Sequence, residues 1–316
     1  MRIRDHSKTL KKLHLSLTST HRSAPSVKKW IHLLLRPKLK SVPQIKINTW
    51  INAAVNSKVE HVEIYDKTFD KFSFEVPSCI FNCHTITVLK LSGVPVKIPY
   101  VDLPSLKVLH LNRVRFPNIK SIQALLYGCP LLQDLALKIW GIKYKRLSIN
   151  KERLKNLISA DVSFYLFTLE SLSNVKALRI DTIGFSPLPD AIVFYNLIHL
   201  EISYYAYSSD GTILQCLRNC PKLETLIIDK FDWRVWRQPG VPQCVSSHLK
   251  EFHLGNFKGR EIEFKLARFI MGNARVLETI SIRRENTSKA TSEQEIMLQR
   301  LSSCPKSSEN CRLLFK

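Results

Sequence analysis

The 316-residue sequence has few glycines, few acidic side chains and no long apolar run, and each shortage excludes a class of protein. Its longest apolar runs, such as WIHLLL and LIHLEI, are far shorter than the roughly 20 residues of a membrane-spanning helix. The nine glycines form no phosphate-binding loop, dinucleotide fingerprint or nucleophile elbow, so the motifs of nucleotide-binding enzymes and serine hydrolases are absent. The basic N-terminus lacks a continuous apolar stretch, so we expect no secretory signal.

The eight cysteines do not form the framework of a disulfide-rich protein, and we expect reduced thiols in a cytoplasmic or nuclear protein. Two groups have spacings that resemble metal ligands: Cys79 and Cys83 with His84, and Cys216 with Cys220. Neither group supplies the paired units and four ligands of a zinc site. We therefore expect these thiols to pack beside leucines, and we expect no metal and no cofactor.

Acidic residues number 26 against 48 lysines and arginines, which gives a formal net charge of +22. Residues 1–58 hold thirteen of the bases and one acid, Asp5, so this segment is much more basic than the rest. It is either a solvated flank or a surface that contacts nucleic acid, an acidic partner or an anionic membrane. No base-reading or aromatic stacking motif accompanies it, so nucleic-acid or polyanion binding is the alternative function, not the preferred one.

What the chain does contain is a repeated leucine pattern, L-x-x-L-x-L, which is clear in LPSLKVLHLNRVRF (103–116). The last apolar residues of successive copies are 20 to 28 residues apart. The copies are 59–64, 86–91, 106–111, 132–137, 154–159 (a weak copy), 175–180, 197–202, 223–228, 249–254 and 277–282, with a further candidate at 10–15. This interval is typical of leucine-rich repeats, whose period is roughly 20–29 residues.

The spacing has a physical reason. The last two leucines of each copy alternate with exposed residues on a short strand, and the first turns inward from the approach to it. Stacked copies predict an α/β leucine-rich-repeat solenoid, a curved parallel sheet with helices or loops on its convex side. Residues 118–129 and 210–220 have the apolar period of such helices, and each ends at a Cys-Pro pair.

Two segments interrupt the pattern. Residues 229–243 contain Trp233, Arg234, Trp236 and Arg237, which form either an aromatic-cationic contact surface or, as we favour, a packing wedge at a boundary. Residues 283–295 are polar without an apolar period, and we expect a loop there.

From residue 241 the sequence resembles the FBD domain, a module at the C-terminal end of many plant F-box/leucine-rich-repeat proteins. The matching residues are Cys244, Ser246, Ser247, His248, Leu249, Lys250, Glu251, Phe257, Lys258, Gly259, Ala267, Asn273, Ala274, Val276, Leu277 and Glu278, followed by the ending at 301–315. Residues 47–64 and 74–94 resemble the start of the repeat region in the same family. The resemblance covers about residues 42–316 and implies a solenoid at 42–240 and an FBD-like domain at 241–316 that continues the repeat. The charge and a possible repeat copy predict a basic N-terminal segment or partial repeat at 1–41.

Members of that family usually begin with an F-box, which docks onto the adaptor of an SCF-type ubiquitin ligase. Residues 26–39 have a Lys-Lys-Trp and a leucine run but no Leu-Pro entry, so we find no F-box in the printed sequence. We therefore expect the receptor half of such a protein, with the SCF adaptor as a partner only where an F-box lies upstream of Met1.

These observations predict a non-enzymatic protein that recognises an unknown target protein, with no membrane partner. The exposed positions between the strand leucines, on the concave face of the solenoid, are the expected binding residues. They are Glu63, Lys90, His110, Lys138, Arg179, Glu201, Ile227, His253 and Ser281.

Overall fold

The computed structural model describes residues 12–17, 32–35, 44–66, 74–98, 100–140, 147–163, 166–180, 192–203, 205–206, 217–232, 240–285 and 291–316. The chain forms two compact units, residues 1–157 and 158–316.

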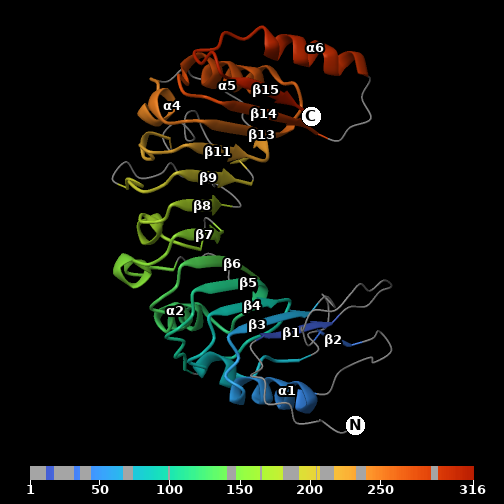
Figure 1. The fold of residues 1–316 in the computed structure, drawn as a ribbon, viewed down its shortest axis with the longest axis vertical. Helices are drawn as coiled ribbons and strands as arrows, with labels where there is room; N and C mark the ends of the chain where they lie inside the picture. The colour runs from blue at the N-terminus through green and yellow to red at the C-terminus, as the bar shows by residue number, and fades with distance from the viewer. Residues whose placement is uncertain are drawn as a thin grey trace. The chain divides into compact units, whose positions relative to one another are not determined.

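The first unit is built on six parallel strands (Figure 1). Their order in the sheet is β2-β1-β3-β4-β5-β6. The strands are β1 (Lys12–Leu17), β2 (His32–Leu35), β3 (His61–Asp66), β4 (Val88–Ser92), β5 (Val108–Arg115) and β6 (Asp134–Trp140).

The second unit continues the same design with seven strands in the order β7-β8-β9-β11-β13-β14-β15, and the pairings given for them are parallel. They are β7 (Ser159–Val162), β8 (Ala177–Ile180), β9 (His199–Ile202), β11 (Thr225–Ile228), β13 (Glu251–Phe257), β14 (Thr279–Arg284) and β15 (Arg312–Phe315). The short strands β10 (Tyr205–Ala206) and β12 (Phe231–Asp232) pair with each other.

The leucines of the repeat form the core, as predicted. Leu89, Leu91, Leu109 and Leu111 are at most 1% exposed, whereas the residues between them are only half-buried. Each such side chain contributes roughly 1.5–3 kcal/mol by leaving water. Because β3, β4, β7, β8, β9 and β11 all show this alternation, stacking the repeats makes one continuous core in each unit. The predicted α/β leucine-rich-repeat solenoid is confirmed.

Helices and single turns of 3-10 helix connect the strands. The helices are α1 (Gln44–Asn56), α2 (Ile119–Tyr127), α4 (Gln243–Ser247), α5 (Glu261–Asn273) and α6 (Thr291–Ser302), and the 3-10 turns are η1 (Ser78–Asn82), η2 (Lys151–Leu154) and η3 (Leu169–Leu172). Helix α2 confirms the helix expected at 118–129, and the Asn118 side chain caps it by accepting from the Ser121 backbone N–H. The helix expected at 210–220 falls largely outside the described residues.

The position of one repeat was predicted wrongly. The weak copy at 154–159 lies too early, because β7 begins at Ser159 and its inward residues are Ala160 and Val162. The small Ala160 replaces the usual leucine and hides the pattern. The candidate copy at 10–15 overlaps β1, which pairs with β3.

The loop expected at 283–295 was also predicted wrongly in part, because residues from Thr291 onward form α6. This helix packs on α5: the Arg300 guanidinium lies 3.9 Å from the centre of the Phe264 ring and 2.6 Å from a Glu261 oxygen. Leu301 is fully buried. Tertiary contacts therefore stabilise a helix whose first five residues, 291–295, are polar. The four Trp and Arg residues of 233–237 lie outside the described residues.

Candidate functional site

Each sheet has an open face, defined here as the face that carries the half-buried residues between the buried strand leucines. In the first unit, strand register aligns Glu63 on β3 with Lys90 on β4 and His110 on β5. Neighbouring strands are about 4.8 Å apart, so these side chains form one row across the sheet. The role of these three residues in binding stays a prediction.

The second unit carries a corresponding row of five predicted residues. Arg179, Glu201, Ile227, His253 and Ser281 occupy successive strands in register. All five are half-buried. The single apolar member, Ile227, lies in the middle of the row.

Lys138 does not belong to the row to which it was assigned. The residue of β6 in register with His110 is Ala136, and Lys138 lies in register with Asn112. The two positions differ by two residues, so Lys138 is on the same face but one step nearer the carboxyl end of the strand. The L-x-L pattern of 132–137 already contains this alanine at the row position.

An ion pair and a hydrogen bond between adjacent strands hold the row of the first unit. The Lys90 ammonium lies 3.0 Å from a Glu63 carboxylate oxygen, and His110 Nε2 lies 2.9 Å from Asp134 Oδ2. Burial raises the pKa of the Tyr65 hydroxyl, and the charge of Glu63 and its hydrogen bond raise this pKa further, against the opposing effect of Lys90. Tyr65 is therefore protonated at neutral pH and contacts Glu63 as a neutral phenol.

The second unit also pairs opposite charges on neighbouring strands. The Arg179 guanidinium lies 3.3 Å from Glu201, and its Nε donates to the Ser203 hydroxyl oxygen at 3.4 Å. At the carboxyl ends of β9, β11 and β14 a cavity of about 660 Å³ is lined by Ser203, Asp229, Lys230, Asn256, Arg283, Arg284 and Glu285. Arg283 and Asp229 form an ion pair of 3.2 Å inside it.

Inference from the sequence missed several residues on or beside these rows, namely Tyr65, Asp134, Ser203 and the cavity residues. Tyr65 and Asp134 lie two residues from the row positions on their own strands, so alternation along the strand was the signal that could have identified them. The cavity has no comparable signal, because its residues come from four repeats.

The cysteines of the two groups considered as metal ligands differ in their burial. Cys83 and Cys220 are buried, as expected, but Cys79 is half-buried and its thiol donates to Asn52 Oδ1 at 3.0 Å. Cys216 lies outside the described residues. Within the described part of the chain, no group of three His, Cys, Asp or Glu side chains is placed to hold a metal ion.

We expect alkylation of the folded protein at pH 8 to modify Cys79 well before Cys129 and Cys244. Burial raises the pKa of Cys129 and of Cys244 to about 12, so their reactive thiolates are scarce at this pH, and their sulfurs are also shielded. The Cys79 pKa is raised too, mainly by burial, but its side chain is accessible. Mass-spectrometric mapping after N-ethylmaleimide treatment measures the order, and early modification of Cys129 would contradict the described core.

Two protein-family models match parts of this chain. The FBD family model matches residues 238–282. The family model described as FBD-associated F-box protein At5g56370, LRR repeats, matches residues 47–181. None of the helices in the described part of the chain is both long and apolar enough to span a bilayer. The domain limits expected at 41/42 and 240/241 stay predictions.

Relatives in Arabidopsis thaliana match across most of the chain. The F-box/FBD/LRR-repeat protein At4g26340 is 27% identical, and the alignment covers 93% of this chain and 83% of the relative. The F-box/FBD/LRR-repeat protein At1g78750 is 23% identical, with 85% and 75% covered, and the F-box/FBD/LRR-repeat protein At3g26920 is 29% identical, with 77% and 70% covered. No solved structure matches the chain. Two different family models and these relatives thus show that the chain is similar to plant F-box/FBD/LRR-repeat proteins over most of its length.

Proposed function

We propose that this protein is a non-enzymatic recognition module that binds a target protein through the open face, as the receptor part of an SCF-type ubiquitin ligase. The names of its relatives support the ligase context, since an F-box is part of each of the names given above. The repeat architecture supports recognition, because it presents side chains on rigid, adjacent strands.

The observation that carries the proposal is the matched charge of the rows. Glu63 with Lys90 and Arg179 with Glu201 are paired across neighbouring strands, although the whole chain has a formal charge of +22. Side chains held by such neighbours lose little conformational freedom when a partner binds. An ordered pattern of both charges favours a protein surface with the complementary pattern over a uniform polyanion.

The test replaces Lys90, His110 and Arg179 together by alanine. This leaves Glu63, Asp134 and Glu201 without their row partners, so we expect a target protein to lose about tenfold or more in affinity. Tagged full-length wild type and variant are compared by quantitative mass spectrometry of co-purifying proteins from plant cells. The affinity of a specifically depleted protein is then measured with the purified pair.

The matched control is Lys107→Ala with Lys155→Ala. Both lysines are exposed and lie off the open-face rows, so the control removes two positive charges without touching the rows. The proposal requires the control to retain the target at wild-type levels. An identical set of co-purifying proteins for all three forms would exclude open-face recognition.

The second candidate function is polyanion binding by the basic segment of residues 1–58, and the charge of that segment favours it. Deleting all of 1–58 is a poor test, because β1 pairs with β3, and Ile47 and Ile51 of α1 are buried. Replacing Lys28, Lys29, Lys38 and Lys40 by glutamine is a more specific test, because it removes positive charge without deleting β1 or α1. Polyanion binding predicts heparin affinity that falls steeply with salt and with these changes; open-face recognition predicts unchanged target binding.

A further inference from the structure

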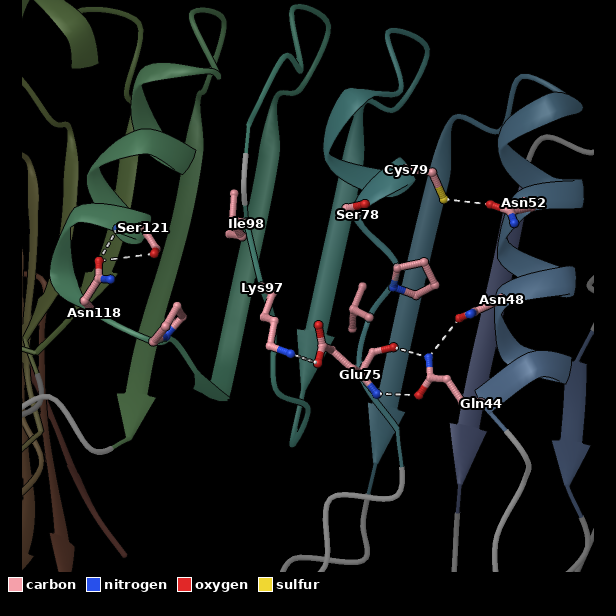
Figure 2. Close-up of a pocket in the computed structure, with 13 residues that line it drawn as sticks. Gln44, Asn48, Asn52, Glu75, Ser78, Cys79, Lys97, Ile98, Asn118 and Ser121 are labelled. Atoms are coloured by element: carbon pink, nitrogen blue, oxygen red, sulfur yellow. Dashed lines mark hydrogen bonds and ion pairs between the residues drawn. The ribbon is translucent and has the colours of Figure 1, made fainter.

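The first unit has a groove of about 970 Å³ on the side of the strands that bears α1, η1 and α2 (Figure 2). One wall is α1, the floor is the segment from Glu75 to Cys79, and the far wall is formed by Lys97, Ile98 and the start of α2. This volume is at the upper end of the range of about 300–1,000 Å³ for ligand pockets. The groove is separate from the open face, since the strands lie between them.

Helix α1 presents a stripe of three side-chain amides to this groove. Gln44, Asn48 and Asn52 follow one another at intervals of four residues and all line it (Figure 2). Four residues of helix rise by about 6 Å. Two residues of an extended peptide span about 6.6 Å, so alternate peptide groups along a strand nearly match the amide stripe.

The side-chain amide of Gln44 already forms hydrogen bonds with an extended backbone segment of this chain. Its Nε2 donates to the Glu75 carbonyl at 2.7 Å, and its Oε1 accepts from the Glu75 N–H at 2.8 Å. The segment it binds is extended, because Val76 forms a parallel bridge with Val96 in the next repeat. A side-chain amide of α1 thus pairs with both the N–H and the C=O group of one residue, Glu75.

The side-chain amides of Asn48 and Asn52 accept hydrogen bonds through their oxygens, but their Nδ2 groups remain available as donors. Asn48 Oδ1 accepts from Gln44 Nε2 at 2.8 Å, and Asn52 Oδ1 accepts from the Cys79 thiol at 3.0 Å. These bonds fix the plane of each amide. Neither Nδ2 group donates to another residue in the described part of the chain, so both offer fixed donors about 6 Å apart.

The rest of the lining indicates what the groove accepts. Its charged residues, Glu75 and Lys97, form an ion pair of 3.1 Å and so neutralise each other. Pro77, Ile98 and Pro117 supply apolar surface. Among the described lining residues there is no aromatic ring on which a nucleobase would stack. The lining therefore suits a neutral chain with regularly spaced carbonyl acceptors.

We propose that the groove binds an extended, uncharged peptide segment of a partner protein, with Asn48 and Asn52 donating to alternate backbone carbonyls. The amides fix the direction and register of the peptide, and the apolar residues contact its side chains. This interaction is independent of the open-face function and gives the protein a second contact with a partner.

The first test uses the full chain and a phage-displayed library of random short peptides. Enriched peptides are labelled with fluorescein and titrated by anisotropy against wild type and the double variant Asn48→Asp with Asn52→Asp. Aspartate keeps the oxygens that accept from Gln44 and Cys79 and replaces only the Nδ2 donors. We expect the double variant to bind about tenfold more weakly or worse, since two hydrogen bonds are lost.

Two controls make the result specific. Asn56→Asp changes an exposed amide on the same helix outside the groove lining, and Lys90→Ala changes the open face; both should bind the peptide as wild type does. Titration at high salt removes the effect of the added charge. The absence of enriched peptides, or equal binding by the double variant, would overturn the proposal.

A second measurement needs no variant. Cys79 lines the groove, so a bound peptide should slow its alkylation by N-ethylmaleimide in the wild-type protein, measured at that residue by mass spectrometry. A peptide that binds elsewhere leaves this rate unchanged. Binding without protection of Cys79 would therefore also overturn the assignment to the groove.

Discussion

Replacing Phe257 by alanine is expected to lower the free energy of unfolding of the second unit by about 3–5 kcal/mol. Phe257 is 1% exposed at the end of β13, and its ring meets those of Phe264 and Phe315 edge to face, with centroid distances of 5.2 and 6.3 Å. The side chain thus joins β13, α5 and β15. Its removal leaves a cavity that three separate elements would have to close.

Urea unfolding of this variant, with hydrogen exchange mapped to residues 251–257 and 312–315, measures the loss. Phe257→Leu is the matched control, because it keeps apolar volume at the site and should cost clearly less than the alanine. A change below about 1 kcal/mol for the alanine variant would contradict the packing described for the FBD region.

Gly93→Ala is expected to destabilise the first unit by about 3 kcal/mol. Gly93 follows β4 with φ of +70°, a left-handed conformation that favours glycine. A Cβ added there would lie 2.1 Å from the Asp66 carbonyl oxygen at the end of β3. The Asp66 oxygen and the Gly93 Cα that would carry the Cβ both belong to backbone next to a paired ladder, so relief requires the backbone of β3 or β4 to move.

Gly272→Ala is the control for this substitution. Gly272 lies in α5, where an added Cβ would have the Pro305 carbonyl oxygen as its nearest neighbour, at 3.9 Å. Alanine also has the higher helix propensity, so this change should leave stability unchanged or raise it by up to about 1 kcal/mol. Equal melting temperatures for the two variants would show that the turn after β4 is not tight.

Much of the fold followed from the sequence because the leucines are the core. A pattern in which two leucines alternate on a strand and a third precedes them is typical of the short parallel strand of a leucine-rich repeat. Strands β3 to β6 adopt this structure. The prediction was wrong where packing overrides local pattern. Ala160 hides β7, and α6 is stabilised by Arg300 on Phe264, a contact between residues 36 positions apart.

The candidate site was predictable in part for the same reason. Alternation places Glu63, Lys90 and Arg179 on the open face, because residues beside buried leucines must face the other way. Which side chains pair across strands depends on rotamers and register. The groove was not predictable, since its amide stripe faces a segment more than twenty residues further along the chain.

The most direct test of open-face recognition is site-specific photo-crosslinking in plant cells. A photoreactive phenylalanine derivative is placed at Lys90 or Ile227 on the rows, and at Lys107 as the control off them. We predict that the same target protein is crosslinked from Lys90 and Ile227 and not from Lys107. Adducts that form at Lys107 and at neither row position would contradict the account.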